Sequence, residues 1–179
     1  DALFAEISSL ESPAKMGFIL AAPSSQAIQT STPTVVLDRV QDAGNVGSIL
    51  RSASAFGFKQ VVAIKGTAGL WSPKVLRAGM GAHFGLKLIE SASAENLQSL
   101  KIPLLGTDVH EGPYLHDMLK QGGLAQKCAW VLGHEGQGVS AEIMALVTQK
   151  IRIAQPGGEE SLNVATAAAI CLHASATSM

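Results

Sequence analysis

A regular alternation of short apolar runs with segments of helical periodicity constrains this fold more than any other feature of the chain. Six runs of four to six residues have the composition of strands buried on both faces: Thr34–Leu37, Gln60–Ile64, Leu86–Ile89, Pro103–Thr107, Cys128–Gly133 and Lys150–Ala154. Helices are predicted between and after them at Val46–Phe56, Pro73–Met80, Ala94–Leu100, Ser140–Val147 and Leu162–Ala174. Strands that alternate with helices predict an α/β domain, with a mostly parallel sheet flanked by helices.

Length and composition agree with one compact domain. The chain has 179 residues, 47% of them hydrophobic and 15% charged, which excludes an extended disordered protein or a coiled coil. No run of eighteen apolar residues predicts a membrane span, and the acidic start of the chain does not resemble a signal peptide, so we expect a cytoplasmic protein that does not engage a membrane. Because the chain begins with Asp1, we expect a trimmed or partial protein. Cys128 and Cys171 lie in apolar stretches and are expected to be buried thiols.

Charge is distributed unevenly along the chain. No acidic residue lies between Asp42 and Glu90, although the net charge of the whole chain is −1. Six cations fall in that interval: Arg51, Lys59, Lys65, Lys74, Arg77 and Lys87. If they gather on one face they would suit an anionic partner such as nucleic acid, because phosphate contacts depend on local charge. Scattered, solvated side chains remain the alternative at this point.

The N-terminal part differs from the rest. Apolar residues at helical spacing in residues 1–12 predict a short amphipathic helix that ends before Pro13. The uncharged stretch from Ala21 to Pro33, rich in Ala, Ser, Thr, Gln and Pro, predicts a linker.

Common nucleotide, hydrolase and zinc signatures are absent from the sequence. There is no P-loop, no G-x-S-x-G elbow and no histidine or cysteine spacing typical of zinc, so no metal site is expected. The segment Gly79–Phe84 has phenylalanine where a dinucleotide fingerprint has its third glycine. The segment Gly133–Gly138 follows a strong strand and precedes a helix, but its glycines are spaced G-x-x-G-x-G. It is therefore a glycine-rich loop of another type.

Three polar segments, at residues 37–51, 133–138 and 153–165, lie where predicted strands end. In the first, Asn45 is a candidate N-cap and Arg51 shares a helix face with Gly47. In the second, Glu135 is the only acid among small residues, and in the third Ser161 or Asn163 precedes an alanine-rich helix. Taken one at a time, each segment is explained by helix capping or by surface charge.

Taken together and in order, these segments resemble a known family. Asn45-x-Gly47-x-x-x-Arg51, Leu132-Gly133-x-Glu135-Gly136 and Glu160-Ser161-Leu162-Asn163-Val164 are similar to the three motifs of the SpoU (TrmH-like) RNA ribose 2′-O-methyltransferases, of the SPOUT class. The resemblance covers about residues 34–177. It implies a C-terminal deep trefoil knot, a homodimer, S-adenosylmethionine as methyl donor, and RNA as substrate, with rRNA favoured over tRNA. It also implies that residues 1–33 are the end of an N-terminal RNA-binding domain plus linker, and that residues 34–179 are the methyltransferase domain.

The resemblance also implies roles for individual residues. The catalytic set is Arg51, Asn45, Glu135, Ser161 and Asn163. The donor-binding set is Thr107, Leu132, Gly133, His134, Glu135, Gly136, Ile153, Ala154, Ser161, Leu162 and Asn163. The RNA-binding set, chosen also by charge, is Arg51, Lys65, Lys74 and Arg77. Because an arginine stays protonated, Arg51 is expected to stabilise developing alkoxide charge or hold the adjacent phosphate, with Asn45 and Glu135 orienting it.

Two other functions stay open on the sequence. One is a catalytically silent RNA-binding or assembly protein of the same fold. The other is an RNA methyltransferase that acts on a base rather than on the ribose.

Overall fold

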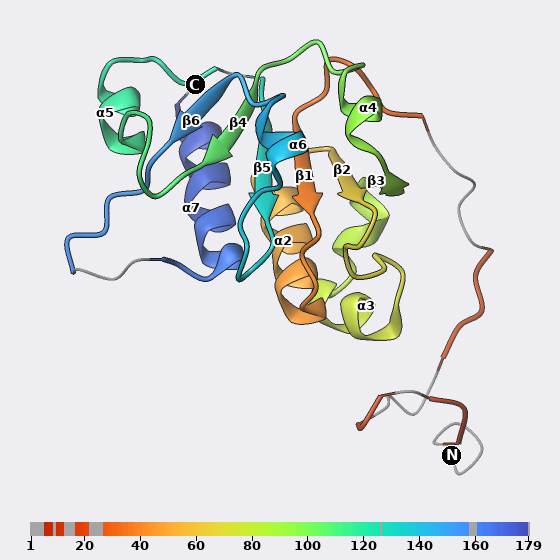
Figure 1. Ribbon diagram of the computed structural model, residues 1–179. Helices are drawn as coiled ribbons and strands as arrows, with labels where there is room; N and C mark the ends of the chain where they lie inside the picture. The colour runs from red at the N-terminus through yellow and green to blue at the C-terminus, as the bar shows by residue number, and fades with distance from the viewer. Residues whose placement is uncertain are drawn as a thin grey trace.

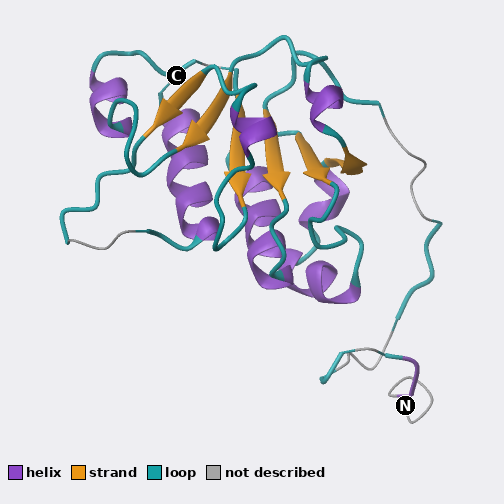
Figure 2. Ribbon diagram, viewed as in Figure 1, coloured by secondary structure: helices purple, strands orange, loops and turns teal. Residues whose placement is uncertain are grey.

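The computed structural model describes residues 6–8, 10–12, 17–21, 27–125, 127–157 and 161–178. Over these residues the chain forms one six-stranded sheet in the order β3-β2-β1-β5-β4-β6, in which every pairing is parallel (Figures 1 and 2). The strands are β1 (Thr34–Asp38), β2 (Gln60–Ile64), β3 (Lys87–Ala92), β4 (Leu104–Thr107), β5 (Ala129–Gly133) and β6 (Gln149–Ile151). All six predicted strands are thus confirmed, with β6 shorter than expected.

Both faces of the sheet are covered, as the apolar runs predicted. Along β1, Val35 and Leu37 point into one core while Val36 points into the other, because side chains alternate across a strand. The first core includes buried residues of α2 (Ala43–Ala55), α3 (Pro73–Gly79), α5 (Leu115–Lys120) and α7 (Val164–Thr177). The second includes residues of the shorter helices α4 (Ala94–Leu97) and α6 (Ala141–Met144), which lie on the opposite side of the sheet from α2 and α7 (Figure 1).

The predicted helices exist, but their lengths differ. Helix α2 begins three residues earlier than expected and α7 runs to Thr177, whereas α4 and α6 are single turns. A short 3₁₀ helix, η1 (Ala82–Gly85), follows α3. Helix α5 was not predicted, because six residues are too few to establish a helical period.

The predicted N-terminal helix lies mainly outside the described residues. Of the residues that are described there, Glu6 and Ile7 are helical and Leu10–Ser12 form a bend. Within the described segments, no helix is long and apolar enough to cross a membrane.

The two cysteines are buried and unpaired with each other, as expected. Burial raises the pKa of Cys128 to about 11 and that of Cys171 to about 12, so neither is a reactive thiolate at neutral pH. Beside them the buried Trp130 indole donates a 2.8 Å hydrogen bond to Ser175 Oγ, which joins β5 to α7.

The order of the strands creates a switch point between β1 and β5. The chain builds outward from β1 to β2 and β3, and then returns to place β4, β5 and β6 on the other side of β1. Parallel strands end at one edge of the sheet, and Asp38 at the end of β1 is paired with Gly133 at the end of β5. Open α/β sheets bind ligands at the carboxyl ends of strands next to such a point.

Candidate active site at the carboxyl edge of the sheet

The first polar segment caps helix α2, though not with the expected residue. The N-cap is Asp42, whose Oδ1 accepts a 2.7 Å hydrogen bond from the backbone N–H of Asn45. The prediction that Asn45 is the N-cap is therefore wrong. Asn45 is the third residue of the helix, and its backbone N–H is one of the groups that the N-cap carboxylate of Asp42 satisfies. The Asn45 side chain is consequently available for contacts outside its own helix.

Glu135, in the glycine-rich loop after β5, accepts three hydrogen bonds from the start of α2. Its Oε1 accepts from Asn45 Nδ2 at 3.1 Å and from the Asp42 N–H at 3.1 Å, and its Oε2 accepts from the Gln41 N–H at 3.2 Å. Partial burial alone would raise the pKa of Glu135. The hydrogen bonds from Asn45 and from backbone N–H groups outweigh it and hold the pKa below the ordinary value. Glu135 is therefore ionised at neutral pH and serves as an anchor at a helix N-terminus, which makes it a poor proton acceptor.

Asn163 connects the third segment to the first. Its Oδ1 accepts hydrogen bonds from the N–H groups of Ala165 (2.9 Å) and Thr166 (3.2 Å), so Asn163 is the N-cap of α7, as one of the two predicted options. Its Nδ2 donates to Asn45 Oδ1 at 3.0 Å. Glu135, Asn45 and Asn163 thus form one continuous hydrogen-bonded chain, and residues up to 118 positions apart in sequence meet at this edge.

Arg51 lies farther along α2, on the exposed surface. It lies six positions after Asn45, a rise of about 9 Å along a helix. Within the described residues, no hydrogen bond joins Arg51 to Asn45 or Glu135, which bond to each other and to the α2 N-terminus instead. The expected orientation of Arg51 by these two side chains is thus not formed in this structure.

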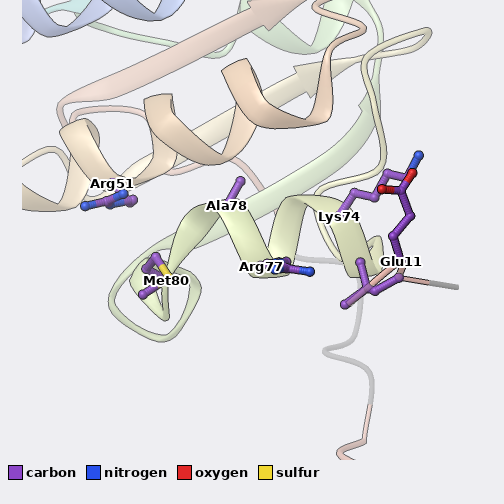
Figure 3. A pocket seen from close by; sticks show the side chains of 7 residues that line it. Glu11, Arg51, Lys74, Arg77, Ala78 and Met80 are labelled. Atoms are coloured by element: carbon purple, nitrogen blue, oxygen red, sulfur yellow. The ribbon is translucent and has the colours of Figure 1, made fainter. Parts of the chain in front are cut away.

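Arg51 instead borders a groove along α3 with a volume of about 530 Å³, which Leu10 and Glu11 of the N-terminal segment also line. Lys74 and Arg77 of α3 line the same groove, and Figure 3 shows these side chains along α3 with Met80 near Arg51 and Glu11 near Lys74. Three of the four predicted RNA-binding cations therefore share one surface. The fourth, Lys65, follows β2 and does not line the groove.

The predicted donor-binding residues converge where β4, β5 and β6 end. Thr107 closes β4 and is paired with Ile151 of β6, and Ile153 and Ala154 follow two and three residues later. Leu132 and Gly133 close the neighbouring strand β5 and are buried. Ser161 and Leu162 are exposed and directly precede Asn163, which the Asn45 contact holds near the loop after β5.

The loop after β5 has a defined shape. A Cβ on Gly133 would overlap the backbone of Gly138 and Val139, so only glycine fits there. The His134 ring accepts at Nδ1 from the N–H groups of Gly136 (3.0 Å) and Gln137 (3.2 Å), which folds the loop back on itself. His134 therefore shapes the loop from within.

Two features near this edge were missed from the sequence. Gln155 has a buried side-chain oxygen with no hydrogen-bond partner in the described part of the chain, next to Ala154. Arg39, directly after β1, bonds to the glycine-rich loop. An unsatisfied atom leaves no signal in a sequence, whereas Arg39 could have been noticed as a cation at the end of a central strand.

The sequence matches the SpoU rRNA Methylase family over residues 32–173, which include all three polar segments. The chain belongs to the SpoU family. No group of three or more potential metal ligands occurs among the described residues of this SpoU chain.

Individual SpoU relatives agree in sequence and in structure. The 23S rRNA (guanosine(2553)-2′-O)-methyltransferase RlmP of Bacillus subtilis is 29% identical over 173 residues, 95% of this chain and 68% of the relative. The structure of a TrmH-family protein from Porphyromonas gingivalis superposes with a TM-score of 0.81 at 32% identity, covering 96% of this chain and 69% of that one. The SpoU methyltransferase AviRb of Streptomyces viridochromogenes, in complex with AdoMet, gives 0.70 at 26% identity, covering 83% and 61%. Matches to some longer relatives cover a quarter or less of those proteins.

The Glu135 anchor predicts a pH-dependent contribution to stability. A carboxylate with a depressed pKa in the folded state stabilises the protein above its unfolded pKa, about 4.5, and this contribution is lost as the pH falls through the lower folded value. Glu135→Gln is expected to melt below the wild type at pH 7, with the gap in Tm shrinking as the pH falls below about 4.5. Thermal denaturation of both proteins across this range measures the gap, and a gap that does not change with pH would contradict the anchor role.

Proposed function

We propose that this chain transfers a methyl group from S-adenosylmethionine to a ribose 2′-hydroxyl of RNA. The observation that carries the proposal is the hydrogen-bonded chain Glu135–Asn45–Asn163, which brings the three family motifs to one edge of the sheet. Support comes from the Bacillus subtilis relative, named as a ribose 2′-O-methyltransferase of 23S rRNA, and from the AviRb structure that contains AdoMet.

The residues at this edge fit the proposed donor. Gly136 leaves its backbone groups accessible, and Gly133 lets the loop fold closely on itself, while Ile153 and Leu162 offer apolar side chains to an adenine ring. The unpartnered oxygen of Gln155 is a buried acceptor that an amino or hydroxyl group of the donor would satisfy. When bound, S-adenosylmethionine supplies an electrophilic methyl group and a leaving sulfur that departs neutral. Thr107 and the loop after β5 would then orient this methyl group toward the RNA.

Arg51 is proposed to act on the attacking hydroxyl. The hydroxyl passes its proton to water or another acceptor as its oxygen bonds to the methyl carbon, and negative charge develops on the oxygen as the proton leaves. A guanidinium stays protonated throughout, so Arg51 would stabilise that charge or hold the adjacent phosphate. The lowered pKa of Glu135 disfavours it as the proton acceptor. Asn45, Glu135, Ser161 and Asn163 are proposed to shape the site around the two reactants.

The groove along α3 that Arg51 borders is proposed as the RNA surface. Arg51, Lys74 and Arg77 outnumber the acidic Glu11 and give it a net positive lining that suits phosphates, with Lys65 as an outlying contact. Ribosomal RNA is proposed over tRNA, since the Bacillus subtilis relative is named for 23S rRNA. We also propose that the chain forms a homodimer and works in the cytoplasm. The boundary between the linker and the methyltransferase domain is proposed to lie near residue 33.

Calorimetric titration with S-adenosylmethionine and S-adenosylhomocysteine tests the donor site. We expect both to bind in the micromolar range, and light scattering to give about 37 kDa, twice the 18.5 kDa of one chain. Mass spectrometry of nucleosides from RNA reacted with the protein should then reveal 2′-O-methylated ribose. A methylated base would indicate a base-directed enzyme, and absence of donor binding would favour a silent RNA-binding protein.

A further inference from the structure

Arg39, the residue after β1, has an unusual backbone conformation. Its φ is +60°, in the left-handed region that glycine and asparagine adopt far more readily than arginine. Met80 and Ser91 are the other non-glycine residues with positive φ in the described part of the chain. Strain of this kind persists where surrounding contacts hold the residue, and it is concentrated at functional sites.

The contacts of Arg39 account for its conformation. Its backbone N–H donates to Thr67 Oγ1 at 3.1 Å, and its Cγ lies 3.3 Å from the position that a Cβ on Gly66 would take. Its guanidinium donates from Nε to Asp38 Oδ1 at 3.1 Å and from Nη1 to Gln137 Oε1 at 3.0 Å. The side chain therefore spans from the end of β1 to the glycine-rich loop after β5.

Asp38 holds the start of α6, just after that loop. Its side chain is only 1% exposed, and its Oδ2 accepts a hydrogen bond from the Ser140 N–H. Arg39 and Asp38 thus hold Gln137 and Ser140 to the end of one central strand. Glu135 lies two residues before Gln137, within the same loop.

We propose that Arg39 is a positioning residue that holds the 133–138 loop in its donor-binding conformation. Resting on the proposed function, the inference adds a second arginine that acts through the loop and not on the reacting atoms. A loop ordered in advance binds its ligand more tightly, because less conformational entropy is lost on binding. The role requires a planar, forked donor that reaches Asp38 and Gln137 together, which lysine does not provide.

The test compares Arg39→Asn with Ser91→Asn. Both replace a residue of positive φ with one that tolerates it, but Ser91 is exposed on β3, at the opposite end of the sheet from β6. We expect Arg39→Asn to weaken S-adenosylhomocysteine binding about tenfold by calorimetry while its Tm stays within about 3 °C of the wild type. Arg39→Lys should bind as weakly as Arg39→Asn, and Ser91→Asn should bind as the wild type does.

Gln137→Ala supplies the second half of a double-mutant cycle. If Arg39 acts through Gln137, the two single variants lose similar affinity and the double variant loses little more. Unchanged donor affinity in Arg39→Asn, or fully additive losses in the double variant, would overturn the proposal.

Hydrogen exchange separates this inference from the proposed function. Amides of residues 134–138 should exchange faster in Arg39→Asn than in the wild type and Ser91→Asn, with no ligand present. If Arg39→Asn exchanges faster but the wild type binds no donor, Arg39 still holds the 133–138 loop and only the methyltransferase proposal is rejected. Unchanged exchange in Arg39→Asn would reject the positioning role of Arg39 itself.

Discussion

Replacing Arg51 with alanine is expected to lower the rate of methyl transfer by about a hundredfold to a thousandfold while the affinity for S-adenosylmethionine stays within about threefold of the wild type. The proposed role places the guanidinium where charge develops on the 2′-oxygen, so its loss raises the barrier to the reaction. Arg51 lies in the groove that Lys74 and Arg77 also line, whereas the residues proposed to bind the donor lie at the ends of β4, β5 and β6. Single-turnover methylation of RNA measures the rate, and calorimetry measures the donor affinity.

Two further variants control for charge and for RNA affinity. Lys74→Ala removes a cation from the same groove and should raise the KM for RNA while kcat changes by less than about threefold. Arg51→Lys keeps the charge but loses the forked donors, and should recover only part of the rate. Loss of donor binding in Arg51→Ala would show that Arg51 belongs to the donor site. If Lys74→Ala lowered kcat as much as Arg51→Ala does, Arg51 would have no special catalytic role and would be one phosphate contact among several.

Much of the fold was predictable because both cores depend on local patterns. The run from Thr34 to Leu37 is apolar at every position after its first residue, and a strand buried on both faces has that composition. The order of the strands could not be obtained in this way. The local sequence of β5 does not predict that it pairs with β1, because that pairing depends on contacts between residues about 95 positions apart. The trefoil knot implied by the family remains a prediction for the same reason.

The site was predictable as a set of segments, whereas its internal bonds were not. Asn45 and Asp42 are both good N-cap residues three positions apart, and propensity alone does not choose between them. The choice decides the chemistry, because Asp42 as N-cap releases the Asn45 amide to join Glu135 to Asn163. Arg39 escaped prediction because its backbone conformation opposes its own propensity and is maintained by distant partners.

The second large effect is expected from Gly47→Ala, which should destabilise the protein by about 2–3 kcal/mol, or about 5–10 °C in Tm. A Cβ at position 47 would lie 2.7 Å from the Gly79 backbone nitrogen and 2.8 Å from the Ala78 carbonyl carbon, and it would overlap the Ala78 methyl group. These atoms are backbone or short side chain, so the two helices must move apart. The cost exceeds the gain of about 1 kcal/mol in helix propensity that alanine brings.

Gly44→Ala in the same helix is the matched control for Gly47→Ala. Its Cβ would meet only the Asp42 side chain, at 3.0 Å, so the Tm should change by no more than about 3 °C. Because α2 carries Arg51 and α3 carries Lys74 and Arg77, separating the helices also moves Arg51 away from the other two cations of the groove. Gly47→Ala should therefore raise the KM for RNA at temperatures where it is still folded, whereas Gly44→Ala should not. A Gly47→Ala protein as stable as the wild type would mean that α2 and α3 are not packed as closely as the structure places them.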